Sequence, residues 1–217
     1  MRINIEKIII DKNQVLKFLG YANRNIPQII LRKIDEEIEI VHDLLQPSAF
    51  IQHFKIDDIK ADNIYFGKKY CLKSSYLAKE LENSFLIYLT IYTIGDKIED
   101  KIREYSNDSE MIRAMILDKI GIVALDNIRN QIKEVIIEEV FPYKISAQLF
   151  PATKDFDISS QKIILDVFKG ENNIISISKY YQFNPIKTVS VIFNIGNVED
   201  KKSICDECKG CNRKCFV

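Results

Sequence analysis

The residues best suited to chemistry lie close together near the end of the 217-residue chain, in the segment CDECKGCNRKC. Four of the five cysteines fall there, at Cys205, Cys208, Cys211 and Cys215, with the spacing C-x2-C-x2-C-x3-C. Thiolates packed this closely are more often metal ligands than disulfide partners in a reducing compartment. The sequence therefore predicts a metal centre in the cysteine-rich tail.

Three kinds of chemistry remain open for these thiols. The spacing is the ligand run of bacterial ferredoxins, with Phe216 where a proline would follow, so an iron–sulfur cluster is the first hypothesis. In two-cluster ferredoxins the fourth cysteine serves the other cluster, so a single cluster here would use Cys71 or a tighter fold around Cys215. Tetrahedral zinc is the main alternative, and free or oxidised thiols are the third. An isolated cysteine such as Cys71 is more often a small buried residue than a ligand.

Composition and charge narrow the class of protein. Lys plus Arg and Asp plus Glu are equal at 31 each, which gives no basic excess for a nucleic-acid partner. The most apolar stretch, FLIYLTIYTIG from Phe85 to Gly95, is shorter than the roughly 18 residues of a membrane span and is typical of a buried strand. No signal-peptide pattern follows MRINIEKIII. We expect a cytoplasmic protein without a nucleic-acid or membrane partner.

One long helix dominates the predicted elements. Apolar residues keep a near-helical spacing from Asp108 or Ser109, either of which could be the N-cap, to about Val140. The pair Phe141-Pro142 ends the helix. Gly121 lies inside it, at a cost of roughly 1 kcal/mol against alanine unless another element packs closely there.

The remaining patterns mix helices and strands without a regular βαβ order. Helices are predicted at 13–21, closed by Gly20, at 28–45, ended by Pro47, after Ser74 or Ser75, and after Ser159 or Ser160. Strands are predicted at 49–56, 63–66, 85–93, 174–178 and 188–196. This order favours an α+β fold with mainly antiparallel strands. Because no linker precedes Asp200, we expect one domain over 1–200 followed by the cysteine-rich tail at 201–217.

Common catalytic motifs are absent from the sequence. It has no GxGxxG, no GxxxxGK[ST] and no GxSxG. His42 falls in a periodic helix and His53 in a predicted strand, where a satisfied or solvent-facing imidazole explains each better than a ligand or base. No spacing of acids selects a catalytic pair, so motifs alone do not make this an enzyme.

Several strings, taken in order, resemble the activation domain of cobalamin-dependent methionine synthase in a stand-alone form. They run nearly end to end and are closed by the cysteine-rich tail. The strings are VLKFLGY, the acidic helix ending in Gln46-Pro47, LTIYTIGDKIEDKI, RAMILDKIGIVALDNI, FPATKDFDISSQK and NPIKTVSVIF. The resemblance implies a curved antiparallel sheet flanked by helices, in agreement with the pattern above.

The resemblance also implies a function. In that family the domain binds S-adenosylmethionine over the corrin of a partner, so that one-electron reduction of an oxidised cobalt is trapped by methylation. The chain would then be an accessory protein for a corrinoid methyltransferase or methionine synthase subunit, with a flavodoxin-like or ferredoxin-like electron donor. Such a domain supplies binding and position, with no catalytic acid, base or nucleophile of its own.

The sequence departs from the family at the nucleotide site. The family segment reads Arg-x-x-Pro-Gly-Tyr; aligned on Pro151, this chain has Gln148, Ala152 and Thr153 instead. Gln148 cannot form the bidentate ion pair that Arg gives a carboxylate, and Ala152 tolerates a positive φ poorly. A family acid on the long helix falls at Asp126. These departures keep an alternative open, in which the chain is a metal-stapled docking module for a corrinoid protein and no longer binds S-adenosylmethionine.

Overall fold

The computed structural model describes residues 1–21 and 25–197. The predicted boundary near residue 200 and the metal ligands Cys205, Cys208, Cys211 and Cys215 lie outside the described residues.

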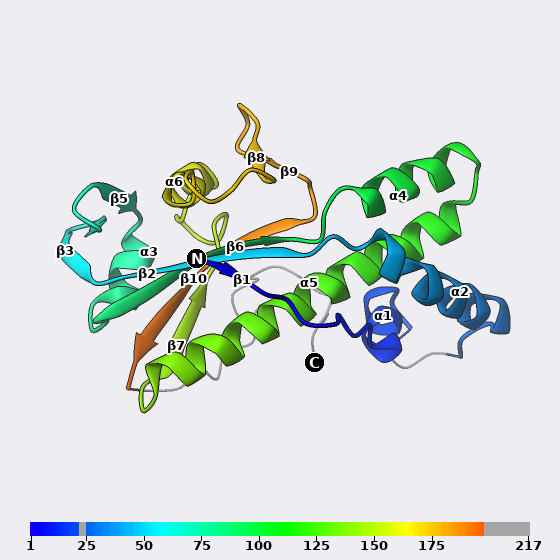
Figure 1. Ribbon diagram of the computed structural model, residues 1–217, viewed down its shortest axis with the longest axis horizontal. Helices are drawn as coiled ribbons and strands as arrows, with labels where there is room; N and C mark the ends of the chain where they lie inside the picture. The colour runs from blue at the N-terminus through cyan, green and yellow to red at the C-terminus, as the bar shows by residue number, and fades with distance from the viewer. Residues whose placement is uncertain (22–24, 198–217) are drawn as a thin grey trace.

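A five-stranded antiparallel sheet forms the centre of the molecule (Figure 1). Its strands, in spatial order, are β1 (Arg2–Ile3), β2 (Ser48–Phe54), β6 (Leu86–Thr93), β10 (Thr188–Gly196) and β7 (Lys144–Leu149). The central strand β6 is the apolar run that begins at Phe85, and every residue in it except Leu86 is buried. A strand that is covered on both faces needs apolar side chains at odd and even positions alike. This explains why apolar and polar residues do not alternate in this run. The predicted α+β class with antiparallel pairing is confirmed.

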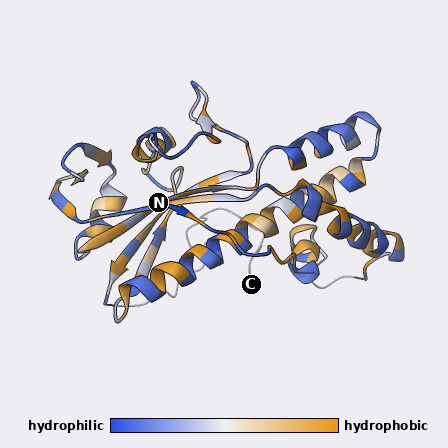
Figure 2. Ribbon diagram, in the orientation of Figure 1, coloured by the Kyte–Doolittle hydropathy of each residue, from blue (hydrophilic) through white to orange (hydrophobic). Residues whose placement is uncertain are grey.

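Helix α5 (Met111–Val140) crosses one face of the sheet diagonally (Figure 1). Its buried side includes Ile116, Ile120, Ile128 and Ile132, which join Tyr88, Tyr92 and Phe193 of the sheet in one apolar cluster. Helices α1 (Lys12–Phe18), α2 (Gln28–Leu44) and α4 (Lys97–Asn107) lie around the N-terminal half of α5. In Figure 2 most of α4 is hydrophilic, because only its narrow inner side, with Ile98 buried, meets this cluster.

The opposite face of the sheet carries a second apolar cluster. It is covered by α3 (Ser75–Leu81), by α6 (Ser160–Val167) and by a small sheet of β3 (Ile56–Lys60), β4 (Asn63–Phe66) and β5 (Tyr70–Lys73). A short hairpin of β8 (Ser176–Ile177) and β9 (Phe183–Asn184) follows α6. The two clusters share the five-stranded sheet as their common wall, so the long helix and the small sheet are held by the same strands.

Two local predictions are confirmed by hydrogen bonds, and close packing explains a glycine inside the long helix. Gly20, at φ +85°, lies just past α1, where its N–H bonds the Lys17 carbonyl and the next N–H bonds the Leu16 carbonyl. Ser74 caps α3, because its hydroxyl accepts from the Leu77 N–H at 3.0 Å. Gly121 is indeed closely packed: a Cβ added there would lie 3.1 Å from Cε of Lys187.

The predicted boundaries of several elements are wrong. Helix α5 begins at Met111, Asp108 is the C-cap of α4, and Ser109 lies in the turn between them at φ +62°. Helix α4 was missed because its many charged residues hide the apolar spacing, so Asp108 looks like a start and not an end. The strand predicted at 49–56 ends at Phe54, and that at 174–178 is reduced to the two residues of β8.

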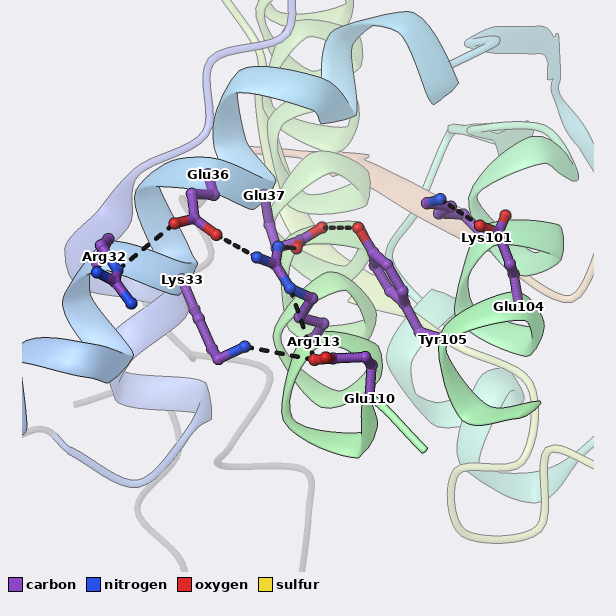
Figure 3. Close-up of polar contacts among 9 residues, drawn as sticks. All are labelled: Arg32, Lys33, Glu36, Glu37, Lys101, Glu104, Tyr105, Glu110 and Arg113. Atoms are coloured by element: carbon purple, nitrogen blue, oxygen red, sulfur yellow. Dashed lines mark hydrogen bonds and ion pairs between the residues drawn. The ribbon is translucent and has the colours of Figure 1, made fainter. Parts of the chain in front are cut away.

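A cluster of ion pairs joins α2, α4 and α5 (Figure 3). The Arg113 guanidinium on α5 donates to Glu37, and the Tyr105 hydroxyl on α4 donates to the other oxygen of the same carboxylate at 3.1 Å. Glu37 is fully buried, whereas Arg113 is 24% exposed. Arg113 also contacts Glu36 and Glu110, the second at 3.7 Å. A buried carboxylate needs such partners, and they tie the three helices together.

Candidate functional site

The residues predicted to bind a cofactor lie toward one end of the central sheet. At that end β6 finishes at Thr93, opposite Ser48 of β2 and Thr188 of β10. Strand β7 stops earlier, because its last pair is Leu149 with Ile192, inside β10. The loop that carries three of the predicted residues therefore begins where β10 loses its partner on that side.

Gln148 lies on the face of the sheet that α5 covers. It pairs in register with Phe193, whose ring belongs to the α5-side apolar cluster. Its Oε1 atom is buried and has no hydrogen-bond partner among the described residues. A buried polar atom without a partner costs about 1–3 kcal/mol, so a donor supplied by a ligand would be favoured there.

Asp126 lies on α5 and is already paired. Its Oδ1 is 2.7 Å from Nη2 of Arg129, a residue only 14% exposed. Burial raises the pKa of Asp126 above its ordinary value, against the opposing charges of Arg129 and Lys133. The Nε atom of Arg129 is buried and lacks a partner within the described part of the chain. Sequence reasoning missed Arg129, although its i, i+3 spacing from Asp126 was a usable signal.

The loop after β7 has the backbone that a glycine would adopt. Ala152 lies at φ +67°, in the left-handed region, which costs an L-residue roughly 1–2 kcal/mol. Its N–H donates to the Phe156 carbonyl at 2.7 Å, and the Phe156 N–H donates to the Thr153 carbonyl at 3.0 Å. Ala152 thus adopts the positive φ that alanine was expected to tolerate poorly. The hydrogen bonds to Phe156, which close the tight turn, hold it there.

Asp155 anchors this loop to α3. Its carboxylate accepts hydrogen bonds from the Ser75 and Ser74 hydroxyls at 2.5 and 2.7 Å and from the Ser75 and Tyr76 N–H groups at 2.8 and 3.1 Å. These bonds, the Ser75 hydroxyl first, hold the pKa of Asp155 well below its usual range. Next to it, Nζ of Lys154 lies 3.6 Å from the centre of the Tyr76 ring. No local pattern predicts the bonds between Asp155 and the start of α3, because the two segments are about eighty positions apart in the sequence.

The structure brings some of the predicted residues together and leaves one apart. Gln148, Pro151, Ala152 and Thr153 follow one another on β7 and its loop, while Asp126 lies on the helix that covers the same face as Gln148. Within the described residues no hydrogen bond or ion pair joins Asp126 to that loop.

The two histidines and Cys71 lie on three different elements. His42 is exposed on α2, and His53 on β2 is 54% exposed with Nδ1 3.6 Å from a Glu139 oxygen. Cys71 is half-buried in β5, and its Sγ lies 3.9 Å from Oδ1, the side-chain oxygen, of Asn63. In residues 1–21 and 25–197 no group of His, Cys, Asp or Glu is arranged to hold a metal ion. None of the helices described there has the length and apolarity to cross a membrane.

These features define an α+β domain with a central antiparallel sheet, one long helix across it, and a tight loop that Asp155 anchors to α3. No protein-family model and no curated protein matches the sequence. Among solved structures, the crystal structure of the MetH reactivation domain bound to AdoHcy is similar to this chain. The TM-score is 0.64 with 10% sequence identity, over 89% of this chain and 75% of that one. At this identity the similarity is one of fold.

Proposed function

We propose that this protein is an accessory factor that assists reductive reactivation of the cobalamin of a corrinoid methyltransferase. The observation that carries the proposal is the fold, which resembles the MetH reactivation domain over 89% of this chain. The partner would be a corrinoid-binding methyltransferase or methionine synthase subunit. An electron donor of flavodoxin-like or ferredoxin-like type would supply the electron.

The proposed role of this chain is to hold S-adenosylmethionine beside the partner's corrin. The ligand would supply a methyl group from its sulfonium sulfur to the reduced cobalt, and S-adenosylhomocysteine would remain. The turn at Ala152 fits this role, because its positive φ keeps the backbone as a glycine would. The buried Oε1 of Gln148 and Nε of Arg129 fit it as well, since a bound polar group would satisfy atoms that lack partners among the described residues.

The lack of a positive charge at position 148 fits this role less well. It lowers the expected affinity for S-adenosylmethionine. Gln148 offers hydrogen bonds but no ion pair, and a charge-assisted bidentate contact is stronger by about 1.5–3 kcal/mol. Binding of S-adenosylmethionine should therefore be roughly ten- to a hundredfold weaker than in the double variant Gln148→Arg/Ala152→Gly. Isothermal titration calorimetry of the two proteins with S-adenosylmethionine and S-adenosylhomocysteine measures the difference. Gln182→Arg adds the same charge to the exposed β8–β9 hairpin and is the matched control.

Each outcome of this titration has a definite meaning. Tighter binding by the double variant, and no change in the control, supports a surviving nucleotide site. Tight binding by the unaltered protein would mean that another residue, such as Arg129, holds the carboxylate. No binding by either protein would overturn this function in favour of the second candidate, a docking module for a corrinoid protein without nucleotide chemistry. The neutral Gln148, in place of a charged partner for the carboxylate, favours that second candidate.

For the tail, we propose that Cys205, Cys208, Cys211 and Cys215 bind an iron–sulfur cluster that serves the same electron transfer. The support is the ligand spacing alone. Anaerobically purified protein should contain iron and sulfide and absorb visible light, and Cys208→Ser should lose both. Stoichiometric zinc without visible absorbance would replace the cluster by a structural zinc site.

A further inference from the structure

A cavity of about 410 Å³ opens at the end of the sheet, on the face that α6 covers. It lies where β2 begins and β6 ends, beside Arg2 of β1, and it is closed by the chain that leads into β8 and by the β9–β10 connection. The residues of the predicted nucleotide loop do not line it. Its walls are formed by Arg2, Gln46, Pro47, Ser48, Gly95, Asp96, Ile174, Asn184 and Pro185.

The walls of this cavity are fixed by hydrogen bonds. The Gln46 N–H donates to the Ile94 carbonyl at 2.8 Å, and the Gly95 N–H donates to the Thr93 hydroxyl oxygen at 3.1 Å. The same Thr93 hydroxyl donates to the carbonyl of Lys187, which ties the end of β6 to the start of β10. Gly95 has φ +83°, and a Cβ there would lie 2.7 Å from Cβ of Gln46. The cavity is thus preformed, and it loses little conformational freedom when a ligand enters.

Two opposite charges line the cavity without neutralising each other. One N–H group of Arg2 donates to the Ser48 hydroxyl at 3.0 Å, which leaves the other donors of the guanidinium available. Asp96 is the N-cap residue of α4, yet its carboxylate makes no capping hydrogen bond. Among the described residues neither charge has an ion-pair partner within 4.0 Å, so the cavity separates them.

The remaining lining groups combine polarity with apolar walls. Gln46 and Asn184 present amide groups that can donate or accept, and neither side chain has a hydrogen-bond partner in the described part of the chain. Ile174, Pro47 and Pro185 offer apolar surface. A ligand with a negative group for Arg2, a positive group for Asp96 and an apolar part for these three residues would complement all of the walls.

We propose that this cavity binds a free α-amino acid with an apolar side chain. The α-carboxylate would accept hydrogen bonds from Arg2, whose planar guanidinium suits a carboxylate. The α-ammonium group would donate to Asp96, and the side chain would lie against Ile174 and the two prolines. The volume is near the lower end of the roughly 300–1,000 Å³ usual for small-molecule sites, which suits a ligand of this size. The proposal is independent of the function proposed above.

The test is calorimetric titration of the full chain with L-leucine, N-acetyl-L-leucine and L-leucinamide. Leucine should bind, and blocking either its ammonium or its carboxylate group should weaken binding about tenfold or more, because each block removes a charge-assisted hydrogen bond. Asp96→Asn should remove the preference over N-acetyl-leucine, and Arg2→Gln the preference over leucinamide. Lys97→Gln changes an exposed charge next to Asp96 that does not line the cavity and should leave binding unchanged.

Other results would overturn the proposal. The absence of leucine binding at about 10 mM, or equal binding of leucine and both blocked analogues, would show that the two charges do not recognise a zwitterion. If Arg2→Gln weakens β1, thermal denaturation will reveal it, and Arg2→Lys, which keeps the charge, should then retain part of the binding. Gln148→Arg and Ala152→Gly lie outside the cavity and should leave leucine binding unaltered, which separates this site from the nucleotide site.

Discussion

Replacing Arg113 by leucine should strongly destabilise the protein, because it removes the charge partner of a fully buried carboxylate. In the folded protein Glu37 is held by the Arg113 guanidinium and by the Tyr105 hydroxyl at 3.1 Å (Figure 3). After the change only the hydroxyl remains. The carboxylate of Glu37, with none of its side chain exposed, would then be buried with its charge unpaired.

The size of the effect follows from the burial of each partner. Breaking a buried ion pair by removing one partner costs about 3–5 kcal/mol. Arg113 is 24% exposed and the Tyr105 hydroxyl still donates, so we expect a loss near the lower value, about 3 kcal/mol. For a chain of this length, that corresponds to a fall in Tm of roughly 6–12 °C.

Urea denaturation at neutral pH measures the loss, and Glu36→Gln is the matched control. Glu36 contacts the same guanidinium but is 40% exposed, so its removal should cost less than about 1 kcal/mol. The double variant Glu37→Leu/Arg113→Leu should recover most of the stability, because it leaves no unpaired charge. The reasoning is refuted if Arg113→Leu costs no more than Glu36→Gln, or if the double variant is the least stable of the set.

Three further changes test other parts of the fold. Ala152→Gly should raise the free energy of unfolding by about 0.5–1 kcal/mol, because glycine adopts the positive φ without strain. Part of the gain is lost because glycine also makes the unfolded chain more flexible. An unchanged denaturant midpoint would contradict the idea that Ala152 is strained. Gly121→Val should cost about 1–3 kcal/mol by displacing Lys187, whereas Gly170→Val, where an added Cβ would meet nothing within 4 Å, should cost less. Asp155→Asn should lower the Tm at neutral pH; since the folded pKa of Asp155 is below its ordinary 3.8, its contribution is complete above that value and fades as the pH falls further, so the two melting curves should converge in acid. A constant difference in Tm across the acid range would contradict this linkage.

The elements that could be predicted from the sequence are those with a local cause. The continuous apolar run of β6 requires burial on both faces, Gly20 requires a left-handed residue, and Ser74 provides a side-chain cap. Helix α4 could not be predicted in this way, because it is amphipathic only over one narrow side and its C-cap, Asp108, is a residue type that also begins helices. The sequence therefore predicted the long helix and the strands β2, β6 and β10 of the central sheet, but not the strands β1 and β7 or the corner between α4 and α5.

The parts of the sites that escaped prediction depend on contacts between distant segments. Asp155 caps a helix about eighty residues earlier, and Arg2 and Asp96 line one cavity although they are about ninety positions apart in the sequence. Such contacts follow from the register of the sheet, and no local pattern encodes them. Asp126 and Gln148 could be selected only because a resemblance pointed to them, while Arg129 was missed because that resemblance does not include it.

In the loop after β7, the backbone shape and the charge that would bind a carboxylate have different causes, although one sequence motif contains both. Its backbone shape is set by packing: Phe156 is fully buried, Asp155 is bonded to α3, and the chain between them and β7 must turn at Ala152 with or without a glycine. The charge that would recognise a ligand's carboxylate is not set by packing, because Gln148 is accommodated at the same place in β7. A shared fold at 10% identity therefore shows the architecture, and the chemistry of this loop depends on its own residues. Under the proposed function, the residue at position 148 sets the affinity for the ligand's carboxylate, and this residue can change while the fold remains the same.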